Sequence, residues 1–256
     1  MSSAHSWSLP PDQPTLGEHE VHIWRASLDY PPDSIGRFRR LLSRDELARA
    51  DRFHFDIDRN HFIVGRASLR IILGFYLSID PVKLEFDYDS YGKPSLAKPF
   101  DTTGLKFNLA HSGRLALYGM TLCPHIGVDI EQIRPELDIE EVAERFFSSG
   151  EVARLRSLQA GLRRKAFFTC WTRKEAFIKA KGLGLSLALD QFEVTLGPEE
   201  PVLLLRTGWD QNEANRWSLK AIDVYPNYVA AIAVESRDWQ LSCWQLDLNA
   251  ITTPAR

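Results

Sequence analysis

The chain has 256 residues, more than a typical single domain, so it forms either one large domain or two of ordinary size, and we expect two. Hydrophobic residues make up 44% and aromatic residues 11% of the chain, which excludes a disordered protein. With 31 Lys and Arg against 34 Asp and Glu, the net charge is −3, so the protein as a whole attracts neither nucleic acid nor an anionic membrane. Any phosphate-binding patch must be local.

The three cysteines, Cys123, Cys170 and Cys243, are widely spaced and include no Cys-x-x-Cys pair. Neither a disulfide framework nor a structural zinc site is indicated, which fits a reducing compartment, and we expect a cytoplasmic protein. The densest apolar run, 71–77, is far shorter than the ~20 residues that a membrane span needs, so it predicts a core helix.

The N-terminal stretch, residues 1–19, is predicted to be a loose arm. It lacks the basic region and the apolar region of a secretory signal, and it contains Pro10, Pro11 and Pro14.

The first predicted element is a strand over 21–28, ended by Pro31 and Pro32, which donate no ladder hydrogen bond. Ser43 and Glu46 form a capping box at a helix start, and a second helix follows with apolar residues at 3/4 spacing. Later strands are predicted over 84–88, 106–110, 115–121, 192–196, 217–224, 229–234 and 241–246. Strands grouped beside helix pairs indicate the α+β class.

The order of signals repeats in the second part of the chain. A shift of 105 aligns residues 43–73 with 148–178 without a gap and gives six identities. These are Ser43/Ser148, Glu46/Glu151, Ala48/Ala153, Arg49/Arg154, Arg59/Arg164 and Phe62/Phe167. The repeat indicates an internal duplication, with halves over 20–122 and 123–256, although chance similarity between amphipathic helices is the alternative.

A first candidate site lies in the predicted strand Gly-Val-Asp-Ile-Glu at 127–131. Side chains alternate along a strand, so Asp129 and Glu131 share one face. Two carboxylates on one face suit Mg²⁺, which takes hard oxygen ligands from protein and phosphate. The alternative is an ordinary strand with a solvated acidic face.

A second candidate site lies on a predicted helix in which Trp171, Glu175 and Lys179 are successive i, i+4 neighbours. The Glu175 carboxylate and the Lys179 ammonium then project from one stripe of the helix. This spacing allows a metal ligand and a phosphate contact to stand side by side. An exposed Glu-to-Lys pair is the alternative. Gly182 and Gly184 end this helix rather than open one, so they predict a C-terminal cap and not a phosphate loop.

A third set of candidates is basic and lies in the first half: Arg66, Lys93 and His111. Each also has a purely structural explanation, as a solvated helix residue, a turn residue and a histidine at a strand end.

Together, these segments resemble the 4'-phosphopantetheinyl transferases of the surfactin-synthetase-activating type. The resemblance is carried by Gly-Val-Asp-Ile-Glu and Trp-x-x-Lys-Glu-Ala-x-x-Lys-x-x-Gly-x-Gly-Leu, preceded by Tyr-Gly-Lys-Pro and Asn-x-x-His-Ser-Gly, in order across about residues 43–196. It implies a fold of two similar α/β halves related by a pseudo-twofold axis, with coenzyme A between them. The chain would work as a monomer that transfers the phosphopantetheine arm of coenzyme A to a serine of an apo acyl or peptidyl carrier protein.

The resemblance also implies roles for single residues. Asp129, Glu131 and Glu175 would coordinate Mg²⁺, with Glu131 the least secure ligand. Lys179 would contact the diphosphate, and Glu175 or a metal-bound water would take the serine proton. Arg66, Lys93 and His111 would hold the nucleotide and its 3'-phosphate. Nucleic acid and membrane are not expected partners.

The chain departs from the family pattern at two positions in the first half. Ala110 stands where relatives often carry serine, so a hydroxyl contact to phosphate is lost or is made by backbone. Glu46 falls where some relatives have a basic residue, which leaves Arg49 or Arg52 as substitutes.

Two other functions are alternatives for this sequence. A non-catalytic binder of coenzyme A or carrier proteins would tolerate loss of the carboxylates or of Lys179, yet all four residues are present. A magnesium nucleotide phosphotransferase would need a phosphate loop, which the sequence lacks.

Overall fold

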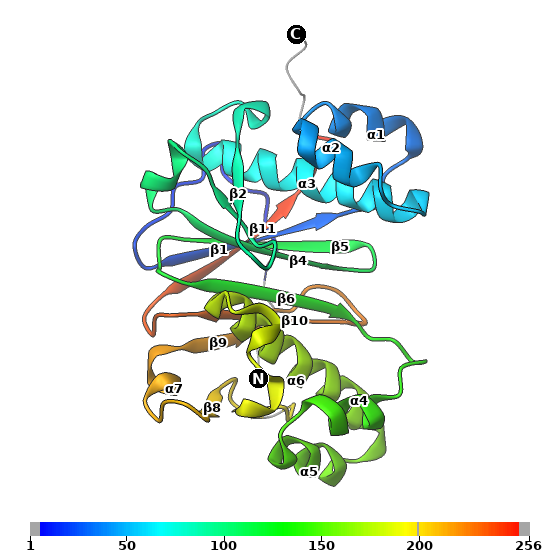
Figure 1. Ribbon diagram of the computed structural model, residues 1–256, viewed down its shortest axis with the longest axis vertical. Coiled ribbons are helices and arrows are strands. Elements are labelled where there is room, and N and C mark those ends of the chain that lie inside the picture. The colour runs from blue at the N-terminus through cyan, green and yellow to red at the C-terminus, as the bar shows by residue number, and fades with distance from the viewer. Residues whose placement is uncertain (1–5, 199, 251–256) are drawn as a thin grey trace.

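The computed structural model describes residues 6–198 and 200–250, apart from the side chain of Leu185. Two β-sheets face one another in the middle of the molecule, and helices cover their outer faces (Figure 1). The α+β class predicted from the sequence is therefore confirmed. Among the described helices, none is both long and apolar enough to cross a membrane.

The first half supplies three strands of the four-stranded sheet and one long helix. Its elements are β1 (Glu20–Ser27), α1 (Pro32–Arg39), α2 (Arg44–Ala50), α3 (Asp56–Leu77), β2 (Phe86–Tyr88), β3 (Pro94–Leu96), β4 (Lys106–Ser112) and β5 (Leu115–Thr121). The second half follows with β6 (Ile126–Gln132), α4 (Ile139–Phe146), α5 (Ser149–Ser157), α6 (Ala160–Lys181), β7 (Phe192–Val194), β8 (Leu204–Thr207), α7 (Glu213–Arg216), β9 (Ser218–Ala221), β10 (Tyr228–Val234) and β11 (Gln240–Leu246).

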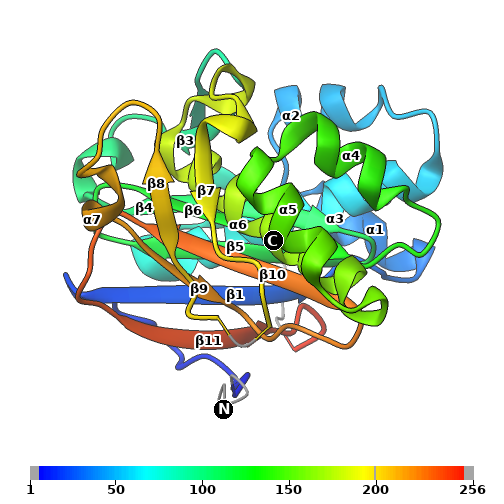
Figure 2. The ribbon, with the colours of Figure 1, turned by 90° about the horizontal axis from the view of Figure 1, so that it is seen from below.

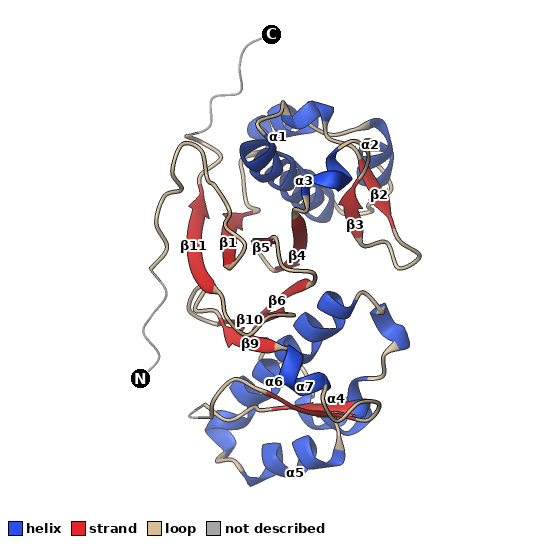
Figure 3. Ribbon diagram, turned by 90° about the vertical axis from the view of Figure 1, so that its left-hand side faces the viewer, coloured by secondary structure: helices blue, strands red, loops and turns tan. Residues whose placement is uncertain are grey.

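Each main sheet has one face on the other sheet and one face on helices (Figure 3). On β6, Val128 and Ile130 pack into the apolar layer between the sheets. On β10, Ala231 and Ala233 pack instead with α6. The period-2 alternation of these strands is what builds the layers, because successive side chains point to opposite faces.

The strand order repeats between the halves. The first sheet runs β11-β1-β5-β4 and the second β6-β10-β9, and β1 with β5 and β6 with β10 form antiparallel pairs. Both short helices α2 and α5 begin at a serine followed three residues later by a buried glutamate. This repeated order supports the predicted duplication.

A buried ion pair recurs at the same place in each half. Arg70 on α3 donates to Glu46 at 2.7 Å and to the carbonyls of Pro81 and Leu84. Lys174 on α6 lies 2.8 Å from Glu151 and donates to the carbonyls of Leu189 and Phe192. The partners are 24 residues apart in the first half and 23 residues apart in the second. The gap-free alignment of 43–73 with 148–178 is therefore wrong by one residue across the long helix.

The last strand crosses from the second half to the first. β11 pairs in parallel with β1, from Glu20 opposite Gln240 to Ala26 opposite Leu246, and so forms the edge of the first sheet. The predicted half over 123–256 is therefore not one structural unit. Alternation in a sequence predicts a strand but not the sheet edge that the strand joins.

The described part of the N-terminal arm is anchored at Ser8, which forms an isolated parallel bridge with Trp244 of this edge strand, and at this point the expectation of a loose arm is corrected (Figure 2). The Ser8 amide donates to the Cys243 carbonyl at 3.3 Å, and the Trp7 indole donates to the Asp223 carbonyl at 2.7 Å. Residues 1–5 lie outside the described part of the chain.

Candidate active site between the two halves

A glycine lets α6 lie directly on β6. A Cβ atom at Gly127 would come within 2.0 Å of the Ala176 carbonyl oxygen and 2.4 Å of the Ala180 amide nitrogen. Because only glycine allows this approach, the backbones of helix and strand are in contact. The helix stripe with Glu175 and Lys179 therefore faces the carboxylate face of β6.

Asp129 is the most buried acid of this group, with only 4% of its surface exposed. Lys179 Nζ donates to its Oδ1 at 2.6 Å, and Oδ2 has no hydrogen-bond partner among the described residues. Burial raises the pKa of Asp129 to about 7, an effect that the Lys179 charge opposes and Glu131 and Glu175 reinforce. Burial therefore disfavours the charged form of this carboxyl group, and the Lys179 ammonium offsets only part of that effect.

The other two predicted ligands lie nearby but have different surroundings. Glu131 Oε2 accepts a hydrogen bond from Ser112 Oγ at 2.9 Å, and Ser112 Oγ accepts one from the Gln132 amide. Burial raises the pKa of Glu175, with Lys179 opposing and Glu131 reinforcing the shift. The sequence put Asp129 and Glu131 on one strand face and Glu175 on a helix stripe, and the structure packs that helix against that strand.

The three acids do not form a ready-made metal cage. In the described part of the chain, no group of three or more His, Cys, Asp or Glu side chains is arranged to hold a metal ion. The reason is local: Lys179 engages Asp129, and Ser112 engages Glu131. Positive charge on the lysine offsets the repulsion that clustered carboxylates would otherwise feel.

A cleft of about 450 Å³ lies where the two halves meet. Its lining includes Arg66, Lys93 and His111 from the first half, with Glu175 and Lys179 from the second. Asp129 joins this set through its ion pair with Lys179. The structure thus brings the predicted basic residues of one half together with the predicted acid and lysine of the other.

Arg66 on α3 has a free donor in this cleft. Its Nη2 donates to the Tyr88 hydroxyl at 2.5 Å, and its Nε lies 3.5 Å from Glu46 Oε1. Its Nη1 is buried and has no hydrogen-bond partner among the described residues. A buried, unsatisfied guanidinium N–H is costly unless an anion accepts from it, so this atom suits a phosphate oxygen.

Lys93 joins the halves instead of standing free. Its Nζ donates to the Lys179 carbonyl at 2.6 Å, in the last turn of α6, where carbonyls lack helical partners. The neighbouring Tyr91 ring lies so close to Gly184 that a Cβ there would come within 2.7 Å. Burial lowers the pKa of Lys93. The prediction of a nucleotide contact for Lys93 stays a prediction.

His111 lies at the end of β4 and is exposed at the mouth of the cleft. Partial desolvation and then the charge of Lys179 lower the pKa of His111.

The departures noted in the sequence have structural explanations. Glu46 is buried against Arg70 and Arg66, so it is a structural acid rather than a ligand contact. Arg49 lines the cleft, whereas Arg52 is an exposed residue outside the lining. Ala110 also lines the cleft and presents only a methyl group.

Sequence reasoning did not single out every polar residue of the lining, and His61 and Asn108 are two that it missed. His61 lines the cleft and pairs with Asp29 at 2.8 Å, a contact between positions too far apart in sequence to foresee. Asn108 accepts from the Val128 amide at 2.8 Å and so holds β4 against β6. Its place in Asn-x-x-His-Ser-Gly was the available signal.

Comparisons with known proteins show which family the chain resembles. The family described as the 4'-phosphopantetheinyl transferase superfamily matches residues 125–233, and the family described as 4'-phosphopantetheinyl transferase, N-terminal, matches residues 31–120. The chain is 43% identical over 240 residues to the 4'-phosphopantetheinyl transferase HetI of Nostoc sp., covering 94% of this chain and 98% of that one. It is 30% identical to Sfp of Bacillus subtilis, covering 79% and 86%.

Among solved structures, the chain is similar to Thermotoga maritima holo-[acyl-carrier-protein] synthase, with a TM-score of 0.37, 22% identity, and coverage of 45% of this chain and 65% of that one. It is also similar to the ACPS-CoA complex from Chronobacterium ammoniagenes, with a TM-score of 0.31, 21% identity, and coverage of 44% and 98%.

Proposed function

The chain belongs to the 4'-phosphopantetheinyl transferase superfamily, and from that premise we propose that its cleft binds coenzyme A and that Asp129, Glu131 and Glu175 hold Mg²⁺ beside it. The enzyme transfers the phosphopantetheine arm of coenzyme A to a serine of an apo carrier protein and releases 3',5'-ADP. The observation that carries the site assignment is the single cleft in which Arg66, Lys93 and His111 meet Glu175 and Lys179.

The residues present fit a magnesium ion. Asp129 Oδ2 is buried without a hydrogen-bond partner among the described residues, and burial raises the pKa of this carboxyl, so a bound cation would stabilise its charged form. Carboxylate oxygens are the ligands that Mg²⁺ takes together with phosphates. Bound there, the ion would neutralise charge on the diphosphate of coenzyme A.

The side chains of this site supply the rest of the reaction. The serine oxygen forms a bond to the phosphorus next to the pantetheine arm, and the bond from that phosphorus to the oxygen of 3',5'-ADP breaks. Glu175 takes the serine proton, and the Lys179 ammonium offsets the negative charge on the departing 3',5'-ADP. Arg66, with its free Nη1, binds the nucleotide end, and Lys93 and His111 support it.

Two further features belong to the proposal. The enzyme works as a monomer, because one chain supplies both walls of the cleft. Sedimentation with and without coenzyme A tests this, and an obligate dimer would contradict it. The enzyme is cytoplasmic, as its three buried free cysteines suit a reducing compartment, and cell fractionation tests this location.

The carboxylate assignment is tested by titrating Mg²⁺ into wild type and variants, with direct metal binding measured by calorimetry in the presence of coenzyme A. Asp129→Ala and Glu175→Ala should abolish transfer and weaken metal binding while the fold is kept. Glu131→Ala should be milder, since Ser112 already engages that carboxylate. Full activity of Asp129→Ala or Glu175→Ala would refute the assignment, and equal loss in all three would show that Glu131 is not the weaker ligand.

The rival function is a binder that does no chemistry. It predicts that wild type binds coenzyme A with no release of 3',5'-ADP in the presence of Mg²⁺ and any carrier protein.

A further inference from the structure

Apolar side chains stand in solvent on the segment between α2 and α3. Phe53, Phe55 and Ile57 are 36%, 62% and 58% exposed. We call these three residues the aromatic lip. Aromatic side chains gathered on a surface are typical of protein interfaces, because their burial there is favourable.

The aromatic lip continues the wall of the cleft. The Phe53 ring packs against Phe62, with 5.4 Å between ring centroids, and Phe62 lines the cleft together with Arg49 and His61. A partner that covers the lip therefore lies at the mouth of the cleft, where a serine has to enter.

The stretch of chain that includes the aromatic lip is rich in arginine. Segment 37–59 carries seven arginines against five carboxylates, although the whole chain has a net charge of −3. Arg39 pairs with Asp51 and Arg59 with Asp56, whereas Arg49 and Arg52 form no ion pair with any residue that the structure describes. Aromatic side chains rimmed by arginine have the composition of interface hot spots.

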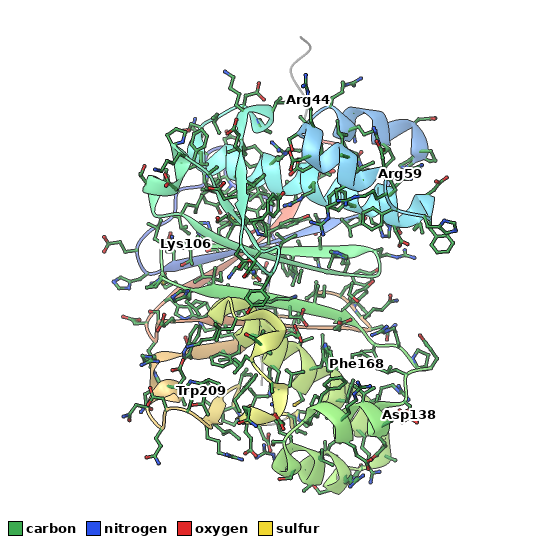
Figure 4. All side chains as sticks on the ribbon, viewed as in Figure 1. Arg44, Arg59, Lys106, Asp138, Phe168 and Trp209 are labelled. Carbon is green, nitrogen blue, oxygen red and sulfur yellow. The ribbon has the colours of Figure 1, made fainter. Side chains whose placement is uncertain are left out.

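The segment of the second half that leads into α4 has the opposite charge. Segment 134–144 of the second half carries five carboxylates against one arginine. Among the ion pairs of the described residues, Glu140 pairs with Arg156 and Arg163, and Glu144 pairs with Arg156. Arg59, at the start of α3, and Asp138, at the start of α4, lie on the same side of the molecule, above and below the junction of the halves (Figure 4). An acidic partner is attracted to the lip and repelled by the α4 side.

We propose that the aromatic lip and the unpaired Arg49 and Arg52 dock the apo carrier protein through a face that combines apolar side chains and carboxylates beside its acceptor serine. This inference rests on the proposed function, because a carrier protein needs a surface outside the cleft that coenzyme A alone does not. It assigns recognition of the protein substrate to the first half.

The test uses the full-length enzyme, coenzyme A, Mg²⁺ and purified apo carrier proteins that differ in the number of carboxylates near the serine. The Phe55→Ser/Ile57→Ser double variant and Arg52→Glu should each raise KM for carrier protein by about tenfold or more. The turnover number at saturating carrier protein and the Kd for coenzyme A should stay within about twofold of wild type. Arg52→Glu should also flatten the dependence of KM on salt.

Matched controls lie at the far edge of the first sheet. Leu9→Ser removes an apolar side chain that is 71% exposed beside β11, and Arg237→Glu reverses a charge just before that strand. Both should leave KM for carrier protein within about twofold of wild type. Thermal midpoints with and without coenzyme A check that every variant is folded.

The results of this test distinguish a failure of the proposed docking surface from a failure of the proposed function. Wild-type transfer with unchanged KM in the double variant and in Arg52→Glu would overturn the docking surface alone. A wild-type dimer that the double variant dissociates would also overturn it and assign the lip to a second copy of this chain. A wild type that binds coenzyme A but modifies no carrier protein would refute the proposed function itself.

Discussion

The close contact of α6 with β6 at Gly127 gives the sharpest structural prediction. In Gly127→Ala the new Cβ would stand 2.0 Å from the Ala176 carbonyl oxygen, at least 1.4 Å short of the 3.4 Å of ordinary contact. The two obstructing groups, the Ala176 carbonyl oxygen and the Ala180 amide nitrogen, belong to the backbone, so no side-chain rotation relieves the clash. The helix and the strand must therefore separate. Overpacking of this kind costs about 1–3 kcal/mol of unfolding free energy.

The separation should harm catalysis more than stability. Glu175 and Lys179 are sequence neighbours of Ala176 and Ala180, and the Lys179 to Asp129 bond is only 2.6 Å long. A shift of about 1 Å in catalytic groups can cost about hundredfold in rate. Gly127→Ala should therefore lower kcat by about hundredfold, with the Kd for coenzyme A much less affected.

The assay compares urea unfolding and transfer kinetics of Gly127→Ala with those of Gly161→Ala. Gly161 lies on the same helix, and a Cβ there would meet nothing within 4 Å. The control should be neutral or more stable by up to about 1 kcal/mol, with unchanged kcat. A Gly127→Ala enzyme as stable and as active as the control would refute the argument that this contact places the catalytic stripe.

Three other predictions follow from the same structure. Arg66→Ala should raise KM for coenzyme A more than KM for dephospho-coenzyme A, because its free Nη1 reads the 3'-phosphate, and an equal penalty on both substrates would contradict this role. Lys174→Met leaves the fully buried Glu151 without its cation and should lower the unfolding free energy in urea by ~3–5 kcal/mol, whereas a loss below ~1 kcal/mol would show the pair to be dispensable. Burial lowers the pKa of His22 below its ordinary 6.5, so the unfolded chain takes up this proton first and stability should fall as pH drops below 6.5. His22→Gln should lose this part of the acid sensitivity in thermal melts between pH 7 and pH 5, and an unchanged slope would refute it.

The site residues were predictable where local geometry determines them. Asp129 and Glu131 share a face because strands alternate, and Glu175 and Lys179 share a stripe because helices repeat every 3.6 residues. Neither rule says that the two surfaces meet. That contact depends on Gly127, whose missing Cβ carries no signal of periodicity.

Long-range contacts explain what the sequence did not reveal. Nothing near Lys93 in the sequence indicates that its ammonium donates to the Lys179 carbonyl, 86 residues away. β11 was predicted as a strand of the second half, but it joins β1 across about 220 residues of chain. A sequence pattern fixes the local element, whereas tertiary packing chooses its partner.

The central claim is that one chain, with a site shared between its halves, moves phosphopantetheine from coenzyme A to a carrier-protein serine. Intact mass spectrometry of a purified apo carrier protein, incubated with the enzyme, coenzyme A and Mg²⁺, tests it most directly. The account predicts a mass gain of one phosphopantetheine on the serine, which disappears when Glu175→Ala replaces the wild type. An unchanged carrier mass with wild type across a panel of acyl and peptidyl carrier proteins, or an equal gain with Glu175→Ala, would contradict it.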